Sequence, residues 1–274
     1  MPELPELEVV KEVLQRRVVG ATIESVEIVL PGGAIVVRDL TRGDSVTALT
    51  GTAIRAVARR GKFLVFALPP LYLVLNPKLT GQLQLAARAE KRMAKTHLVL
   101  VLSNGAELRY VDQKTMGQLY LTRDLAAVPD FAGMGPEPFG ISLDEFRARL
   151  RPYRGEIKGI LTHGEFIAGI GNAYADEILW HARLHPYRKR TQLTPEEIAR
   201  LYEAIQSTLR DAVEKVRAEM GEQIHLKPRD FLAVHMKTGE PCPRCGTPIS
   251  LVGANQRITN FCRTCQPGGL IKGM

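Results

Sequence analysis

The chain has 274 residues, of which 45% are hydrophobic and 24% charged, and this balance excludes an intrinsically disordered protein. Its 37 lysines and arginines exceed its 29 aspartates and glutamates, so the formal net charge is +8, which favours a polyanionic partner such as nucleic acid. The acidic, proline-rich start argues against a signal peptide, and no apolar run is long enough to span a membrane, so we expect a cytoplasmic protein.

Residues 1–129 predict one helix followed by a β-rich domain. Apolar residues from Leu7 to Val18 recur at helical spacing, and Gly20 ends that run. One helix leading into several short strands is typical of a β-sandwich domain. Short apolar runs bounded by turn residues predict the strands at 21–30, 53–59, 63–68, 72–75, 97–102, 107–111 and 118–122.

Beyond residue 130 the pattern becomes helical, which makes the whole chain an α+β multidomain protein. Residues 130–142 are rich in proline and glycine and predict a linker before a helical domain at 143–230. Thr194 to Glu197 form a capping box with proline at the first helical position, and this box begins a long amphipathic helix. The other predicted helices are 143–150, 157–161 and 173–184.

The C-terminal segment, residues 231–274, predicts a zinc finger. Cys242 and Cys245 form one CxxC pair, and Cys262 and Cys265 form another. Two such pairs supply four thiolates, the tetrahedral ligand set of a structural Zn²⁺ ion. The segment has few large apolar residues, so metal binding must supply its folding free energy. Arg257 lies between the pairs in a predicted β-hairpin, either as a phosphate contact or as a solvated arginine.

The amino terminus contains a candidate nucleophile. Pro2 follows Met1 directly, so removal of the initiator methionine would leave a secondary amine. An ordinary α-amino group has a pKa of about 7.7–8, so it is partly neutral at physiological pH and can attack C1′ of a sugar. Glu3 is adjacent and Glu6 lies one turn away, where an acid could protonate the opening sugar. The residues alone leave open that Pro2 and Glu3 simply begin a helix.

The first eight residues, MPELPELE, resemble the start of the formamidopyrimidine-DNA glycosylase family, also called MutM, and are less similar to endonuclease VIII. The resemblance continues in order along the whole chain. Its further blocks are RRGK at 59–62, LRYVD at 108–112, GPEP at 135–138, IK at 157–158, GIGNAYA at 169–175, QRIT at 256–259, and the last CxxC pair with Gln266. This resemblance implies an N-terminal β-sandwich, a helix–two-turn–helix domain and a zinc-finger hairpin.

The resemblance also implies a base-excision-repair enzyme that is both a DNA glycosylase and an AP lyase. Pro2 would form a Schiff base and Glu3 would assist base loss, with Glu6 nearby. Lys62 would act at the sugar and phosphate during β-elimination, and Arg257 would assist δ-elimination. Because a base inside a duplex is out of reach, the damaged nucleotide would be flipped out of the stack.

Several residues would contact the DNA, and some depart from the family pattern. Asn172, at the start of a helix, and Lys158 would lie against phosphates. Residues 76–81 read NPKLTG where the family has HLGMSG, so Leu79 replaces a methionine that inserts between bases. Residues 112–117 read DQKTMG where the family has DPRRFG. Met116 therefore replaces a phenylalanine wedge, and Lys114 an arginine that pairs with the unpaired base.

Lys95 stands at the position of a DNA-contacting histidine, and the segment 217–241 is shorter than in members that enclose 8-oxoguanine. The damaged base therefore stays open between 8-oxoguanine or formamidopyrimidines, oxidised pyrimidines, hydantoins and abasic sites. We expect one structural zinc, a monomer, and double-stranded DNA with damaged bases or abasic sites as the partner, which would place the protein on the nucleoid. The alternatives are a non-catalytic binder of abasic or damaged DNA and an RNA-binding zinc protein.

Overall fold

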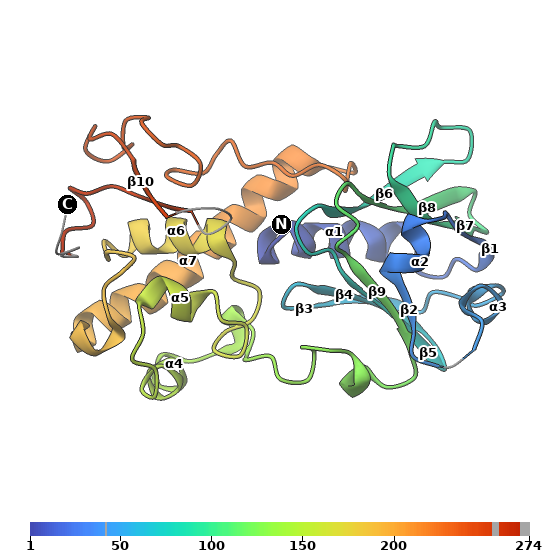
Figure 1. Cartoon of the computed structure of the whole chain (residues 1–274), viewed down its shortest axis with the longest axis horizontal. Coiled ribbons are helices and arrows are strands. Elements are labelled where there is room, and N and C mark those ends of the chain that lie inside the picture. The colour runs from blue at the N-terminus through green and yellow to red at the C-terminus, as the bar shows by residue number, and fades with distance from the viewer. Residues whose placement is uncertain (42, 254–257, 269–274) are drawn as a thin grey trace. The chain divides into compact units, whose positions relative to one another are not determined.

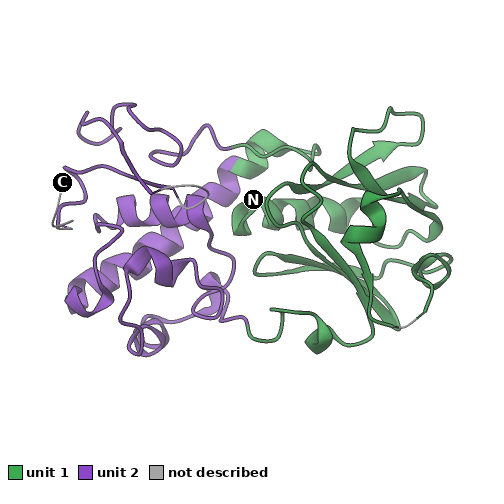
Figure 2. Cartoon of the chain, in the orientation of Figure 1, with its two compact units in different colours: residues 1–133, 216–228 green, residues 134–215, 229–274 purple. Residues whose placement is uncertain are grey.

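The computed structural model describes residues 1–41, 43–253 and 258–268 (Figure 1). The chain forms two compact units, each assembled from two stretches of sequence (Figure 2). Unit 1 contains residues 1–133 and 216–228, and unit 2 contains residues 134–215 and 229–274. The domain boundaries expected from the sequence lie after residues 129, 142 and 230. None of them separates residues 216–228, which belong to unit 1, from residues 134–215, which belong to unit 2.

Unit 1 begins with helix α1 (Leu4–Arg17), which buries one apolar face. Pro5 lies in its first turn, where a missing N–H costs nothing, and Arg16 and Arg17 in its last turn suit the negative end of the helix dipole. The chain leaves the helix at Val18 and turns at Gly20, whose φ of +89° favours glycine. The helix predicted from Leu7 to Val18 is therefore confirmed.

Two sheets make up the sandwich of unit 1. The first sheet has the strand order β1-β7-β8-β6, and the second sheet has the order β2-β9-β5-β4-β3. Strand β2 pairs with β9 in parallel, and all other neighbouring strands are antiparallel. The strands are β1 (Ile23–Ile28), β2 (Val37–Asp39), β3 (Ala56–Arg60), β4 (Phe63–Leu68), β5 (Leu71–Asn76), β6 (Gly81–Ala87), β7 (Thr96–Leu102), β8 (Ala106–Asp112) and β9 (Gln118–Thr122).

All seven strands predicted in this region are present, and the β-sandwich is confirmed. The structure adds strands β2 and β6 and the short helices α2 (Gly32–Val36) and α3 (Ser45–Leu49). Strand β6 escaped prediction because a buried glutamine interrupts its apolar pattern. Gln84 is only 4% exposed, and its side-chain amide nitrogen donates to Glu90 at 3.0 Å, so a polar residue lies at a buried position of this strand.

Unit 2 is helical, with a small two-stranded sheet. Its elements are α4 (Leu143–Leu150), α5 (Ile157–Leu161), α6 (Asn172–His181), most of α7 (Pro195–Met220), β10 (Ser250–Val252) and β11 (Thr259–Phe261). The predicted capping box is confirmed, because Thr194 N–H donates to Glu197 at 2.9 Å and Glu197 N–H donates to the Thr194 hydroxyl at 3.3 Å.

Helix α6 is shorter than predicted, and its cap differs. The N-cap residue is Gly171 and Asn172 is already helical, so the Asn172 side chain does not cap this helix. At the other end Arg183 adopts a left-handed φ of +56°, which stops the helix before Leu184. Within the described residues, no helix combines the length and apolar character that a membrane span requires.

Candidate functional site

The predicted nucleophile lies at a buried position in unit 1. Pro2 is buried directly before α1, and Glu3 and Glu6 are 2% and 1% exposed. A small cavity of about 20 Å³ borders this point. Its lining residues come from α1 and the residue before it, from β4 and β5, from β6 and the loop before it, and from the end of α7 and the segment that follows: Pro2, Glu6, Leu7, Val10, Leu64, Leu75, Pro77, Gly81, Gln82, Leu83, Met220, Ile224, Leu226 and Lys227.

The two glutamates have different positions at the start of α1. Glu3 is the N-cap residue, and its backbone N–H donates to the carboxylate of Glu6 at 2.9 Å. Glu6 therefore fixes the backbone that carries Glu3 and, next to it, Pro2. Burial among apolar side chains holds this start in one conformation, since Leu4 and Leu7 are 0% and 3% exposed.

Lys62 lies in the turn between two strands of the second sheet. Arg60 pairs with Phe63, so Gly61 and Lys62 form a two-residue hairpin turn, in which Gly61 has a φ of +56°. Arg59 fixes this turn by donating from its guanidinium to the Gly61 carbonyl at 3.0 Å and to the carboxylate of Glu8, on α1, at 2.6 Å. The RRGK block thus connects the Lys62 turn to the helix that carries Glu3.

The residues predicted to enter the DNA lie on loops of unit 1. Leu79 belongs to the loop between β5 and β6, and Lys114 and Met116 belong to the loop between β8 and β9. Met116 is 46% exposed, which is unusual for a large apolar side chain, and Lys114 is also exposed. Lys95 is exposed just before β7 and has a left-handed φ of +63°.

Lys158 and Asn172 lie together in unit 2. The Lys158 amine contacts Asp176 at 2.6 Å and donates to the Thr259 hydroxyl at 2.8 Å and to the Ile258 carbonyl at 3.0 Å. The Asn172 side chain donates to the same Ile258 carbonyl at 2.9 Å. Both side chains therefore hold the start of strand β11. Arg257, the preceding residue, lies outside the described residues.

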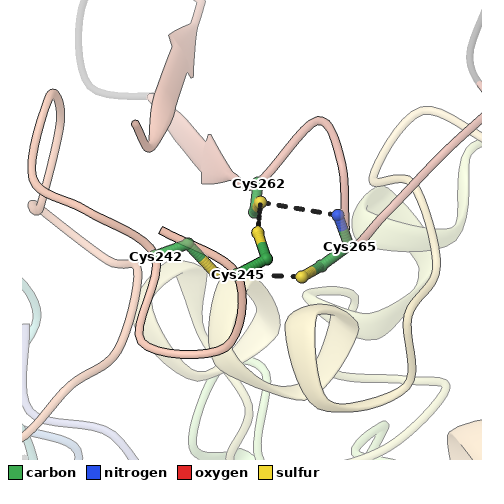
Figure 3. Close-up of side chains that lie close together, drawn as sticks. All are labelled: Cys242, Cys245, Cys262 and Cys265. Carbon is green, nitrogen blue, oxygen red and sulfur yellow. Dashed lines mark hydrogen bonds between the residues drawn. The ribbon is translucent and has the colours of Figure 1, made fainter. Parts of the chain in front are cut away.

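The four cysteines of unit 2 come together at one point, as the sequence predicts (Figure 3). Their sulfur atoms all lie within 4.8 Å of one another; Sγ of Cys242 is 3.8 Å from Sγ of Cys265, and Sγ of Cys245 is 3.4 Å from Sγ of Cys262. Four thiolates at Zn–S bonds of about 2.3 Å have sulfur separations of this size. The ligand set and its dimensions fit one structural Zn²⁺ ion.

Second-sphere contacts support the cysteines. Trp180, the single tryptophan of the chain, donates its indole N–H to Sγ of Cys242 at 3.4 Å. Gln266, which is fully buried, accepts from the Cys262 N–H at 2.9 Å and donates to the Leu184 carbonyl at 2.9 Å. Such contacts orient metal ligands and attach the finger to the helical part of unit 2.

Two buried carboxylates on α6 complete this attachment, and sequence reasoning missed both. Asp176 is fully buried and contacts Lys158 and, at 2.8 Å, Nδ1 of His235. Glu177 accepts backbone N–H groups of residues 233, 234 and 235 at 2.8–2.9 Å. Burial raises the pKa of Glu177, and these hydrogen bonds oppose the rise. The only sequence signal was an acidic pair within an apolar helix.

Sequence reasoning also missed Lys227 and Asp112. Lys227 lines the cavity beside Pro2 and contributes a cation to an otherwise mainly apolar lining. Asp112 is fully buried and accepts hydrogen bonds from the loop between β5 and β6 and from the loop between β8 and β9. A usable signal for Asp112 was its place at the end of a strand and the start of a turn, where aspartate often bonds to the following backbone.

Comparison with known proteins gives matches along nearly the whole chain. Residues 1–119 match the formamidopyrimidine-DNA glycosylase N-terminal domain, residues 134–222 the H2TH domain of that glycosylase, and residues 239–268 the zinc finger found in FPG and IleRS. The finger match agrees with the four-cysteine geometry, so the chain carries one structural zinc site.

Individual relatives agree with these domains. The formamidopyrimidine-DNA glycosylase of Symbiobacterium thermophilum is 39% identical, over 97% of this chain and 90% of its own length. That of Pelotomaculum thermopropionicum is 36% identical, over 97% and 99%. Among solved structures, Lactococcus lactis Fpg with abasic-site DNA has a TM-score of 0.85 and 31% identity, over 97% of this chain and 100% of that one.

A MutM structure in complex with DNA containing carbocyclic 8-oxo-G has the same TM-score, 0.85, with 33% identity and the same coverage. Sequence, all three domains and fold therefore agree over 97% of the chain. This chain therefore belongs to the formamidopyrimidine-DNA glycosylase family, whose members are bifunctional DNA glycosylases and AP lyases of base excision repair.

Proposed function

We propose that this chain excises oxidised bases from duplex DNA and then cleaves the strand, with the amine of Pro2 as the nucleophile. The observation that carries this proposal is the start of α1. Pro2 lies at a cavity with Glu6, and Glu3 is held beside it by its hydrogen bond to Glu6. Pro2 is buried, and the carboxyl groups of Glu3 and Glu6, which are 2% and 1% exposed, lie at the same end of the helix.

The chemistry follows from these groups. Once Met1 is removed, the Pro2 nitrogen attacks C1′ of the flipped nucleotide, and Glu3 donates a proton as the damaged base leaves. The C1′–O4′ bond then breaks with a proton delivered to O4′, which opens the sugar ring and leaves an iminium between the Pro2 nitrogen and C1′. This iminium makes the 2′ proton acidic, and removal of that proton expels the 3′ phosphate in β-elimination. We propose that Lys62 acts at the sugar and phosphate in this step, that Arg257 assists the later δ-elimination, and that Glu6 positions Glu3.

We propose that unit 2 grips the DNA backbone and the loops of unit 1 open the base stack. The positive N-terminal end of α6, at Asn172, suits a phosphate. Lys158 has three internal oxygen partners, so it supports the finger strand and meets a phosphate only by exchanging one of them. The net charge of +8 supports a monomer bound to DNA on the nucleoid, in the cytoplasm.

We propose that the damaged base fits against the end of α7 and the residues that follow it. Met220, Ile224 and Leu226 give the cavity beside Pro2 an apolar wall, and Lys227 adds one cation, whose amine lies 3.5 Å from the Thr80 carbonyl. We propose that this short segment admits oxidised bases of several kinds, among them 8-oxoguanine, formamidopyrimidines and oxidised pyrimidines. An enclosed pocket for one base would require a longer segment.

Borohydride trapping tests the proposal. Purified protein with its N-terminal residue verified is mixed with duplexes that contain an abasic site, 8-oxoguanine or an oxidised pyrimidine, and borohydride reduces any iminium to a stable adduct. We expect an adduct that maps to Pro2 and is much weaker in a Pro2→Gly variant that still binds DNA, because the glycine amine can form an imine but lacks the ring that fixes the nitrogen. The order of the duplexes gives the substrate preference.

The opposite result is equally clear. If Met1 has been removed, DNA binds and no duplex gives an adduct, the chain is a non-catalytic binder of damaged DNA and the proposed chemistry is wrong. If an adduct forms at a lysine instead, the Schiff base is real but Pro2 is not the nucleophile. A Glu3→Gln variant should lose base excision while it keeps trapping on a preformed abasic site, because no base has to leave there.

A further inference from the structure

Two loops of unit 1 are joined by one buried carboxylate. The first loop, residues 76–81, follows β5 and carries Leu79, and the second, residues 112–117, follows β8 and carries Lys114 and Met116. We use the term loop clasp for the residues that connect them: Thr80, Gly81, Tyr110, Asp112 and Gly117. The inference below rests on the proposed function, in which these loops open the base stack.

Asp112 is at the centre of the loop clasp and is fully buried. One of its oxygens accepts the backbone N–H groups of Met116 at 2.8 Å and Gly117 at 2.7 Å. The other accepts the Lys114 N–H at 3.2 Å and the hydroxyl of Thr80, on the first loop. A single carboxylate thus holds the backbone of the second loop and also reaches the first.

Thr80 makes the connection in both directions. Its hydroxyl donates to Asp112 and accepts the Lys114 N–H at 3.0 Å. The chain separation is 34 residues between Thr80 and Lys114, so this is a tertiary contact between loops and not a local turn. Movement of either loop tip away from the other would break both of these hydrogen bonds.

Tyr110 and two glycines complete the loop clasp. The Tyr110 hydroxyl donates to Asp112 at 3.1 Å. A Cβ added at Gly81 would lie 2.3 Å from that hydroxyl oxygen, and one added at Gly117 would lie 1.5 Å from it. The last residue of each loop therefore packs against the same phenol, at a distance that only glycine permits. Gly81 is also the direct cross-strand partner of Asp112.

The loop clasp also balances local strain. Lys78 and Thr115 adopt left-handed backbone conformations, with φ of +48° and +53°, and such residues persist only where surrounding contacts determine them. Burial alone would raise the pKa of Asp112, but the hydrogen bonds from Thr80, Gly117, Lys114 and Tyr110 lower it. Asp112 is therefore ionised at neutral pH, which strengthens every hydrogen bond that it accepts.

We propose that Asp112 is a positioning residue, which through Thr80 holds both loops in one arrangement so that Leu79 and Met116 enter the base stack together. Without this connection the two loops would sample separate conformations, and stack opening would require both to be ordered at the moment of binding. Asp112 itself touches neither substrate nor nucleophile. Its effect is confined to the step in which the base leaves the stack.

The test compares a step that requires stack opening with one that does not. Asp112→Asn places an amide where the carboxylate accepts five hydrogen bonds, and Thr80→Val removes only the link between the loops. We expect Asp112→Asn to slow excision of an intact damaged base by about tenfold, the effect of weakening hydrogen bonds to a charged group. Trapping on a preformed abasic site, where no base is stacked, should change by less than about twofold on the same scale.

Thr80→Val keeps the volume of the side chain and should show the same selective loss, at about threefold, since it removes the two hydrogen bonds of the Thr80 hydroxyl and leaves the other hydrogen bonds to Asp112 in place. Glu107→Gln is the matched control. Glu107 is 6% exposed, lies on the same strand as Asp112 and pairs with Arg109 at 2.7 Å, far along β8 from the loops. This variant disturbs β8 without touching the loop clasp, so its ratio of excision to trapping should equal that of the wild type.

A fluorescence measurement separates this inference from the proposed chemistry. In a Pro2→Gly background, 2-aminopurine beside the damaged base should brighten on binding, and Asp112→Asn should reduce that signal at saturating protein. Equal loss of excision and trapping, no loss of either, or the same selective loss in Glu107→Gln would each overturn the inference. Absence of any Pro2 adduct would instead overturn the proposed function, and the fluorescence result would still decide the role of Asp112.

Discussion

The two units hold their functional residues by different physical means. In unit 1, helix α1 and both sheets bury apolar side chains, and Pro2 and Glu3 directly precede the helix, whose residues Leu4 and Leu14 are fully buried. In unit 2, the finger has a small core around Trp180 and Val234 and is held mainly by four thiolates and by polar contacts.

The difference shows where each unit is vulnerable. Apolar burial in unit 1 is spread over many side chains, so the loss of one weakens the unit without abolishing it. The finger depends on one metal site and on two buried carboxylates, Asp176 and Glu177, so a single atom change can release it. The following changes test this contrast, in order of expected effect.

Removal of zinc should have the largest effect. A chelator strong enough to extract the metal, or Cys262→Ser, removes a binding free energy of about 10–16 kcal/mol for structural zinc sites. We expect DNA binding to fall by at least about a hundredfold, the scale of several lost backbone contacts. Limited proteolysis should then cut residues 239–268 first, while unit 1 stays resistant. Simultaneous loss of both units would contradict the contrast.

Asp176→Asn should be the next largest. It removes the charge that compensates the buried Lys158 amine, and breaking a buried ion pair costs about 3–5 kcal/mol. We expect a lower unfolding temperature and faster zinc release, measured by calorimetry and a metal indicator. Asp211→Asn, on the exposed face of α7, is the matched control and should change the unfolding free energy by less than about 0.5 kcal/mol. Equal effects of the two variants would refute the role of Asp176.

Leu14→Ala tests the apolar support of unit 1. Leu14 is fully buried on α1, and truncation of such a leucine costs about 2–5 kcal/mol. Denaturant unfolding should show this loss, whereas the zinc content and the trapping of an abasic site at low temperature should be unchanged. A fall in zinc content would mean that the two units do not respond separately.

Acidification should have the smallest effect and should separate the units by pH. Burial lowers the pKa of His181 below its usual value of 6.5, so below that pH the unfolded chain binds more protons and unit 2 loses stability. In unit 1, burial alone would raise the pKa of Glu8, but hydrogen bonds from Lys11 and Arg59 lower it below its usual value. Stability from such a carboxylate is present above about pH 4.3 and is lost only as the pH falls further.

The measurement is denaturant unfolding at pH 7, 6 and 5, followed separately by Trp180 fluorescence for unit 2 and by far-UV circular dichroism. His181→Gln should remove part of the slope between pH 7 and 5. If that slope persists in full in His181→Gln, the histidine is not its source. A metal indicator in parallel shows whether zinc release contributes.

The fold was predictable where one local pattern decides the structure. Helical spacing gave α1, the capping box gave the start of α7, and alternating apolar runs gave seven strands. Prediction failed where tertiary contacts decide. Strand β6 contains a buried glutamine whose amide nitrogen donates to Glu90, and α6 ends at His181, two residues before the left-handed Arg183, which no local pattern indicates.

The site divides in the same way. The cysteines were predictable because their spacing carries the chemistry, and they come together as expected. Asp112 had a local signal at the start of its turn, but its contact with Thr80 is distant in sequence and could not be predicted. Asp176 and Lys227 likewise act through partners that are distant in sequence. The roles of Pro2, Glu3 and Lys62 came from resemblance, and they remain predictions until trapping is done.

The discontinuous make-up of unit 1 has a consequence for dissecting the protein. A fragment ending at residue 133 lacks residues 216–228, and with them Met220, Ile224, Leu226 and Lys227 from the wall beside Pro2. Conversely, a fragment that starts at residue 134 contains residues 216–228 but lacks the apolar residues of unit 1 that surround them. Neither half expressed alone reproduces a native unit, so the two should regain activity only as a complementing pair.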